Sequence, residues 1–422
     1  MNHSTLKKFA AKARLDLIDQ VGARLQYVLS SDSVELRERA AQVKQLREAL
    51  KQESEAALIE RVAYTWFNRL AALRFMDAAD RHPFGCRVVT ATPGNTQPEL
   101  LQQARNGSIP EGLRVDARRM NDLFDGRVPS SDPQAEVYQM LIVAVCNFYH
   151  QLMPFVFEKI ADYTELLLPV DLLSEASLAN GFRTAITDED CEEVELIGWL
   201  YQFYISEKKD EVIGKVVASE DIPAATQLFT PNWIVKYMVQ NSLGAQWLAT
   251  YPQSPLKGQM EYYIEPAEQT DEVNAQLAAI TPSQLNPETL TLIDPASGSG
   301  HILVEAYELF KAIYLERGYR QRDVPQLILE KNLFGLDIDE RAAQLTGFAL
   351  MMKGRADDRR LFERGVKLNV MALVDSAGFD AEALTKGMKL ADYELKPGDL
   401  TELKRLFEHA TTFGSLIQVP EG

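Results

Sequence analysis

The sequence predicts an α/β protein in which a large all-α N-terminal region precedes a partial doubly wound sheet flanked by helices. Good helix formers and apolar residues at three- and four-residue spacings fill residues 1–82, which predicts packed helices. Short apolar runs end in aspartate at Asp294, Asp337 and Asp375, and helical patterns follow the first two. We therefore expect a helical domain at 1–220 and a ligand-binding domain at 221–422.

The helical region is interrupted once. Turn-forming residues are frequent between Arg81 and Pro133, and helical periodicity returns at Gln134 and again from Leu196 to Ile205. Four arginines (Arg114, Arg118, Arg119 and Arg127) lie in the interrupted stretch. The aromatic residues of the first helices, such as Trp66 and Phe67, are typical of a bundle core.

Composition limits the classes of partner. The net charge is −17 and the isoelectric point is near 4.9, so an average surface of this protein repels DNA, and any DNA contact requires a local basic patch. No apolar run reaches the length of a membrane span. The cysteines Cys86, Cys146 and Cys191 are far apart, which predicts reduced core thiols of a cytoplasmic protein and no metal site.

The second domain opens with a helix-start signal. Thr230 precedes Pro231, so we expect the threonine hydroxyl to cap the helix and the proline to occupy its first turn. Ile234, Val235 and later apolar residues then mark the buried side of that helix.

The stretch 290–304 predicts a ligand site. A β-compatible run ends at Asp294, the small-residue loop 295–300 follows, and a helical pattern starts at His301. Gly298 and Gly300 lack a Cβ atom, so the backbone can turn sharply and a ligand can lie close to it. The following helix presents unpaired N–H groups and the positive end of its dipole to the same place.

The residues of this loop discriminate between ligands. A phosphate-binding loop requires Gly-Lys-Ser/Thr, and His301 stands at the lysine position. A dinucleotide fingerprint requires a small residue where Leu303 stands. A carboxylate at the strand tip, Asp294, suits a ligand with an ammonium group, such as the methionine end of S-adenosylmethionine.

Two further acids follow predicted strands. Asp337 is expected to hold ribose hydroxyls, because a carboxylate at the end of the second strand can accept two hydrogen bonds from a cis-diol. Asp339 is expected to cap the next helix instead. Asp375 ends a third apolar run and could meet the adenine amino group of the same ligand.

Three segments resemble motifs of adenine-specific DNA methyltransferases, which bind S-adenosylmethionine on a Rossmann-like sheet. Gln227–Val235 resembles the tenth motif, Ile293–Gly300 the first motif with Ser297 in the usual cysteine place, and Phe334–Asp339 the second. The sequences of three longer segments are similar to those of the PglX family, the large adenine-specific methyltransferases of the bacterial phage-exclusion systems called BREX. These segments are Phe157–Pro169, Ile197–Val212 and Ile222–Pro231.

The resemblance implies a function for the second domain. It would form the S-adenosylmethionine-binding part of an enzyme that methylates the N6 amino group of adenine in double-stranded DNA, marks host DNA in anti-phage defence and works with other BREX proteins. The implied cofactor-binding residues are Thr230, Pro231, Asp294, Pro295, Ala296, Ser297, Gly298, Ser299, Gly300, His301, Asp337, Ile338 and Asp375.

One expected motif is missing. The family's Asn/Asp-Pro-Pro-Tyr/Phe loop accepts hydrogen bonds from the flipped adenine and stacks on it, and the sequence has no Pro-Pro pair. We therefore expect the N-terminal part of a larger enzyme, inactive alone, with the catalytic residues beyond it. The main alternative is a non-catalytic cofactor-binding scaffold or interaction subunit of a defence complex. A methyltransferase acting on small molecules or proteins is a third hypothesis.

Overall fold

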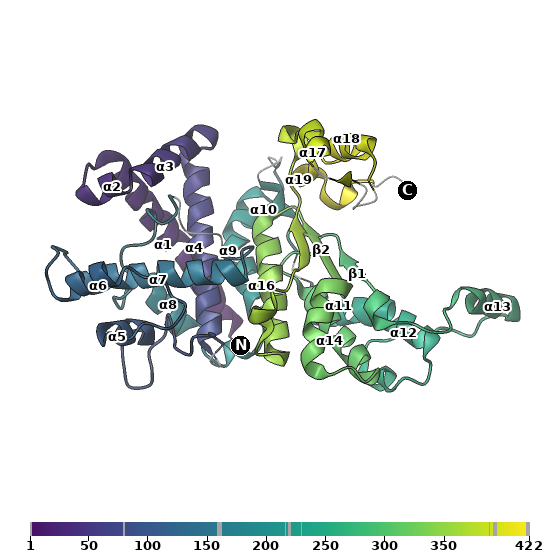
Figure 1. The fold of residues 1–422 in the computed structure, drawn as a ribbon. Helices are drawn as coiled ribbons and strands as arrows, with labels where there is room; N and C mark the ends of the chain where they lie inside the picture. Colours follow the sequence, from purple (N-terminus) through teal and green to yellow (C-terminus); the bar gives the residue numbers. More distant parts are fainter. Residues whose placement is uncertain are drawn as a thin grey trace. The chain divides into compact units, whose positions relative to one another are not determined.

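The computed structural model describes residues 2–78, 81–157, 163–215, 217, 221–228, 230–387, 389–390 and 395–418. Two parts of the resembling segments, 158–162 and Phe229, lie outside the described residues. The chain divides into two compact units, Met1–Glu207 and Lys208–Gly422, which are considered separately below. Figure 1 colours them from purple to teal and from teal to yellow. The functional assignment of the two predicted domains stays a prediction.

The regular structure of the first unit, in its described residues, is helical, and irregular segments join the helices. Serine and aspartate side chains cap several of them: the Ser54 hydroxyl accepts the Ala57 N–H, and the Asp132 carboxylate accepts the Ala135 N–H. The helices are α1 (His3–Ser30), α2 (Val34–Glu38), α3 (Ala40–Gln52), α4 (Glu55–Asp77), α5 (Glu99–Arg105), α6 (Ala117–Phe124), α7 (Pro133–Leu152), α8 (Leu178–Ala185) and α9 (Glu195–Val212).

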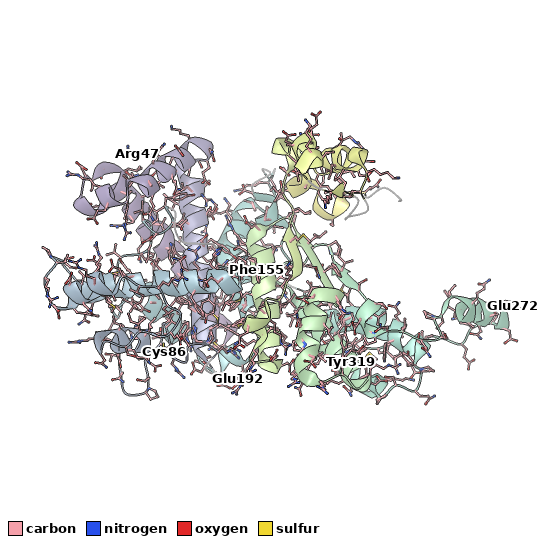
Figure 2. The ribbon with its side chains drawn as sticks, in the orientation of Figure 1. Arg47, Cys86, Phe155, Glu192, Glu272 and Tyr319 are labelled. Carbon is pink, nitrogen blue, oxygen red and sulfur yellow. The ribbon has the colours of Figure 1, made fainter. Side chains whose placement is uncertain are left out.

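The core of the first unit lies where α1 and α4 pack together. Leu17 and Leu25 of α1 and Trp66 of α4 are fully buried, as expected for a bundle core. The three cysteines are buried and form no disulfide. Burial raises the pKa of Cys86, labelled in Figure 2, to about 12, so this thiol stays protonated and unreactive near neutral pH.

A buried carboxylate anchors the irregular stretch that follows α4. Asp77, at the end of α4, is completely buried and lies 2.8 Å from the His82 ring. The carboxylate also accepts the backbone N–H groups of three consecutive residues, Val88, Val89 and Thr90, at 2.6–2.9 Å. The charge is thus compensated by four partners, which fixes a loop that has no regular structure of its own.

The second unit contains a small sheet and more helices. Its elements are α10 (Ile222–Thr226), α11 (Asn232–Val239), α12 (Ala245–Thr250), α13 (Asp271–Ile280), β1 (Leu292–Asp294), α14 (His301–Glu316), α15 (Val324–Leu327), β2 (Leu333–Asp337), α16 (Glu340–Asp357), β3 (Asn369–Ala372), α17 (Ala381–Gly387), α18 (Pro397–Leu406) and α19 (Ala410–Phe413).

The three apolar runs form three parallel strands, as predicted, and the strand order is β1-β2-β3. Ile293 pairs with Phe334, and Phe334 pairs with Asn369. Helices α14 and α16 pack on one face and bury Leu333 and Gly335 of β2. The mixture of helices with a parallel sheet confirms the α/β class.

The carboxyl ends of the parallel strands gather the predicted acids at one edge. Asp294 ends β1 and Asp337 ends β2. The other face of the sheet exposes Ile293 and Met371, each more than half accessible to solvent.

Candidate functional site

The loop between β1 and α14 lies over the end of β2. The Ser297 N–H donates to the Leu336 carbonyl (2.9 Å), and the Gly300 N–H donates to the Ser297 carbonyl (2.8 Å). Gly298 and Gly300 both have positive φ, +52° and +91°, which other residues rarely adopt. The loop is therefore a tight, defined turn that opens α14, as the sequence predicts.

The two glycines of the turn have different surroundings. A Cβ atom on Gly298 would have no atom within 4 Å, so the backbone borders open space. A Cβ atom on Gly300 would lie 2.9 Å from the Thr346 hydroxyl of α16. Gly298 thus leaves room for a ligand, whereas Gly300 allows α16 to approach the start of α14.

Asp294 and Asp337 are both buried beside this turn. The Asp294 carboxylate accepts the Ala296 N–H (3.1 Å), and burial raises the pKa of Asp294 above its ordinary value. Asp337 bridges the first and second motif segments: its carboxylate accepts the Gly298 N–H (2.7 Å) and the Asp339 N–H (2.8 Å). Burial also raises the pKa of Asp337, although these two hydrogen bonds oppose the shift.

Both carboxylates accept hydrogen bonds from backbone N–H groups. Within the described part of the chain, Asp294 and Asp337 form no ion pair with lysine, arginine or histidine. Each oxygen of Asp337 accepts one backbone hydrogen bond, so further acceptor capacity remains. A pair of buried negative charges without cations favours a ligand that brings a positive charge and hydroxyl donors.

The structure corrects the predicted cap at Thr230. Helix α11 starts at Asn232, its N-cap residue is Pro231, and no side chain caps it. Thr230 thus lies one residue before the N-cap position, and its hydroxyl does not cap the helix. Helix α11 nevertheless packs against α14, which brings the segment after Pro231 to the helix that follows the loop. Its Val235 and Val239 are buried as expected, whereas Met238 is exposed.

The remaining predicted residues lie at the same strand ends. Asp339 is the N-cap of α16 and accepts the Arg341 N–H (3.0 Å), which confirms the predicted cap. His301 begins α14, and its ring lies 3.2 Å from the Ser299 hydroxyl. Pro295 and Ala296 are exposed at the turn.

Two further predicted cofactor-binding residues, Asp375 and Ile338, contact the end of the described chain. One Asp375 oxygen accepts both the N–H and the hydroxyl of Thr411 (2.8 and 2.9 Å). Ile338 is half-buried, and its Cγ2 atom would lie 2.8 Å from a Cβ atom on Gly414. The segment around α19 thus borders the ends of β2 and β3.

Sequence reasoning missed Thr346. This residue of α16 is completely buried, and its hydroxyl donates to the Gly298 carbonyl at 2.8 Å. The available signal was a hydroxyl residue between apolar neighbours on the buried side of a helix. That signal is weak, since a helical threonine usually bonds a carbonyl of its own helix.

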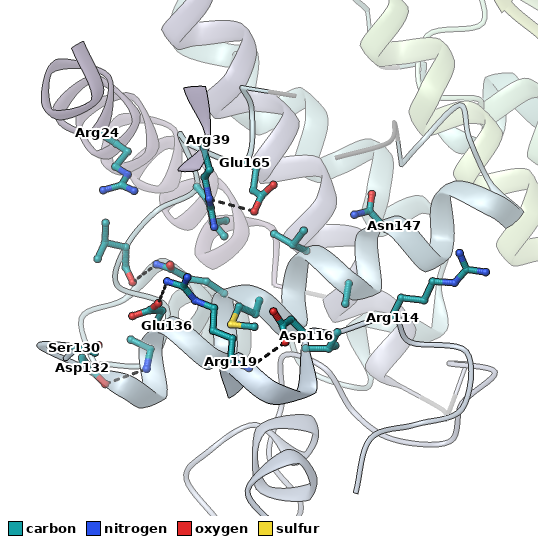
Figure 3. Close-up of a pocket in the computed structure, with 18 of the residues that line it drawn as sticks. Arg24, Arg39, Arg114, Asp116, Arg119, Ser130, Asp132, Glu136, Asn147 and Glu165 are labelled. Atoms are coloured by element: carbon teal, nitrogen blue, oxygen red, sulfur yellow. Dashed lines mark hydrogen bonds and ion pairs between the residues drawn. The ribbon is translucent and has the colours of Figure 1, made fainter. Parts of the chain in front are cut away.

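Several arginines in and near the arginine-dense stretch of the first unit are paired with acids. A cavity of about 500 Å³ is lined by Arg24, Arg39, Arg114 and Arg119, and two of these pair with acids (Figure 3). Arg39 pairs with Glu165 (3.2 Å) and Arg119 with Glu136 (2.7 Å). Arg127, outside the cavity, pairs with Asp125. Charge that is already paired attracts a polyanion weakly.

The described residues contain neither a metal-binding cluster nor a membrane-spanning helix. No group of three or more histidine, cysteine, aspartate or glutamate side chains there is arranged to hold a metal ion. None of the helices in that same part of the chain has the length and apolar character needed to cross a bilayer.

Comparison with known proteins identifies relatives over the whole chain. The adenine-specific methyltransferase BrxX of Escherichia coli O9:H4 (strain HS) is 46% identical over 100% of the chain. The adenine-specific methyltransferase PglX of Lacticaseibacillus casei (strain Zhang) is 33% identical over 99% of it. The chain spans 38% of the length of each of these relatives. No family model matches it. The resemblance to PglX is thereby confirmed.

Proposed function

The chain belongs to the same family as the adenine-specific methyltransferases BrxX and PglX, and we propose that its site at Asp294 and Asp337 binds S-adenosylmethionine. The observation that carries the proposal is a pair of buried carboxylates that have no cationic partner among the described residues and lie beside an open glycine and the start of α14. S-adenosylmethionine carries an ammonium group, a sulfonium and a ribose diol, which match this arrangement of acceptors.

The proposed roles follow from the position of each residue. Asp294, at the end of β1, holds the ammonium group, with Thr230 and Pro231 on the segment that leads into α11. Asp337 accepts the ribose hydroxyls with the acceptor capacity that its backbone partners leave. Ile338 and Asp375 border the adenine ring. The sheet is then the cofactor half of a Rossmann-like fold, in which ligands lie at the carboxyl ends of the strands.

The proposed reaction belongs to the whole enzyme. Bound S-adenosylmethionine supplies an electrophilic methyl group, and the enzyme moves it to the N6 amino group of an adenine flipped out of double-stranded DNA. The residues of this chain bind and orient the cofactor. In the bacterial cytoplasm such an enzyme marks host DNA as part of a BREX defence complex with other BREX proteins.

Calorimetric titration tests the cofactor site directly. We expect S-adenosylmethionine and S-adenosylhomocysteine to bind the chain, and Asp294→Asn or Asp337→Asn to weaken binding by about tenfold or more, because each loses a charged acceptor. Asp210→Asn, at an exposed position of α9, is the matched control and should bind normally. Undiminished binding by both site variants would refute the assignment.

A second candidate is a non-catalytic cofactor-binding scaffold in a defence complex. Three observations favour this scaffold function for the polypeptide alone. Residues 1–422 contain no Pro-Pro loop, the net charge is −17, and Arg119 is paired with an acid. A methyl-transfer assay on DNA with this chain should be blank under both proposals. Formation of N6-methyladenine would show that the catalytic group lies within these residues.

A further inference from the structure

The peptide group between Gly298 and Ser299 is held from outside the loop. Its carbonyl oxygen accepts the Thr346 hydroxyl of α16 at 2.8 Å. The preceding N–H, that of Gly298, donates to Asp337 at 2.7 Å. Both the N–H and the carbonyl of Gly298 therefore bond residues distant in sequence, although glycine is the residue with the greatest backbone freedom.

The carbonyl contact fixes the direction of the next N–H group. In a planar trans peptide the C=O and N–H bonds point in opposite directions. Because the Gly298 carbonyl points to α16, the Ser299 N–H points away from α16. No acceptor for the Ser299 N–H is found among the described residues. A donor without a partner at the start of a helix is suited to an anionic ligand group.

Thr346 also limits movement of the turn by packing. The absent Cβ of Gly300 would lie 2.9 Å from the Thr346 hydroxyl, 3.0 Å from its methyl carbon and 3.1 Å from its Cα. The side chain is completely buried, so no water competes for its hydroxyl. It uses that hydroxyl on a residue 48 positions away and not on its own helix.

We propose that Thr346 is a positioning residue of the cofactor loop, which aims the Ser299 N–H at a carboxylate of the ligand. The identity of that ligand, S-adenosylmethionine with its methionine carboxylate, rests on the proposed function. Without the Thr346 hydroxyl, the peptide group between Gly298 and Ser299 can rotate more freely, since this rotation changes ψ of Gly298 and glycine has the widest range of backbone angles. The N–H would then no longer be held in the direction of the ligand.

Two substitutions separate the hydroxyl from the shape of Thr346. Thr346→Val keeps the branched shape and removes the donor, whereas Thr346→Ser keeps the donor. We expect Thr346→Val to weaken binding of S-adenosylhomocysteine by about three- to tenfold in calorimetry. The same variant should speed hydrogen–deuterium exchange of the segment 295–303 without ligand. Thr346→Ser should stay within about twofold of the wild type in affinity.

A matched control removes a threonine hydroxyl elsewhere. The Thr65 hydroxyl donates to the Arg61 carbonyl of its own helix, so Thr65→Val should change neither measurement. If Thr346→Val folds poorly, Thr346→Ala is measured in its place, because it removes the same hydroxyl and introduces no branched side chain. Unchanged exchange of 295–303 in these variants, or equal losses in Thr346→Ser and Thr346→Val, would overturn the proposal. If the wild type binds neither cofactor form, the proposed function fails, while the exchange comparison still decides the role of Thr346.

Discussion

Each of the two units buries aspartate, but in opposite electrostatic settings. Asp77 of the first unit accepts three backbone N–H groups and lies 2.8 Å from His82. Asp294 of the second unit is also buried, yet it accepts one backbone N–H. A compensated buried charge holds structure together, whereas an uncompensated one weakens the folded state until a ligand supplies the missing partner. This is the difference that we expect between a structural carboxylate, Asp77, and the proposed binding carboxylate, Asp294.

The largest effect is expected from removing the compensated charge. Asp77→Ala leaves three N–H groups and a histidine without their acceptor, so we expect the free energy of unfolding to fall by about 3–5 kcal/mol. Chemical denaturation measures this. Asp16→Ala, at an exposed ion pair with Lys12 (3.9 Å), should change stability by less than about 1 kcal/mol. A small effect of Asp77→Ala on the free energy of unfolding would contradict the structural role of Asp77.

Asp294→Asn should change stability and binding in opposite directions. The variant removes an uncompensated buried charge, so the free energy of unfolding at neutral pH should rise by about 1 kcal/mol. Affinity for S-adenosylmethionine should fall by about tenfold or more, because the acceptor for its ammonium group loses its charge. Denaturation and calorimetry on the same samples test both signs. A loss of stability together with unchanged affinity would place Asp294 with Asp77 as a structural residue.

The pH dependence of stability sharpens the same contrast. Burial raises the folded-state pKa of Asp294 and Asp337 above the ordinary value of 3.8. The folded state therefore binds more protons than the unfolded state between the ordinary pKa and the raised one, and these two groups weaken the fold above that window. The stability advantage of Asp294→Asn over the wild type should shrink as pH falls through the raised pKa. Denaturation of both proteins from neutral pH to about pH 4 measures it. An advantage that is constant with pH would contradict the raised pKa.

The smallest effect concerns an uncharged group. Ser297 is buried, and its hydroxyl has no hydrogen-bond partner among the described residues. Ser297→Ala removes this unsatisfied group, so we expect the protein to gain up to about 1 kcal/mol of stability, visible as a higher melting temperature. Ser297→Cys should behave similarly, because a thiol needs a partner less. The half-buried Ser299 offers the control Ser299→Ala, which should have little effect. Destabilisation by both Ser297 variants would show that the hydroxyl has a partner.

Local patterns predicted the local features of the site well. The strand, the Asp294 break, the turn with positive-φ glycines and the helix from His301 lie within a dozen residues, so neighbouring residues specify them. The Asp339 cap was predictable for the same reason. The Thr230 cap was wrong because Pro231 itself became the N-cap, and a shift of one residue at a helix end is within what local signals leave open.

The sequence by itself determined where the glycine-containing turn after Asp294 lies and which family the chain resembles, because such features depend on adjacent residues. Only the tertiary structure decided that Asp337 holds the Gly298 N–H across 39 residues and that Thr346 holds the Gly298 carbonyl across 48. It also decided that, among the described residues, Asp294 and Asp337 have no cationic partner, whereas Arg39 and Arg119 of the first unit pair with acids. Burial and pairing arise from contacts between distant segments, and no spacing along the chain encodes them.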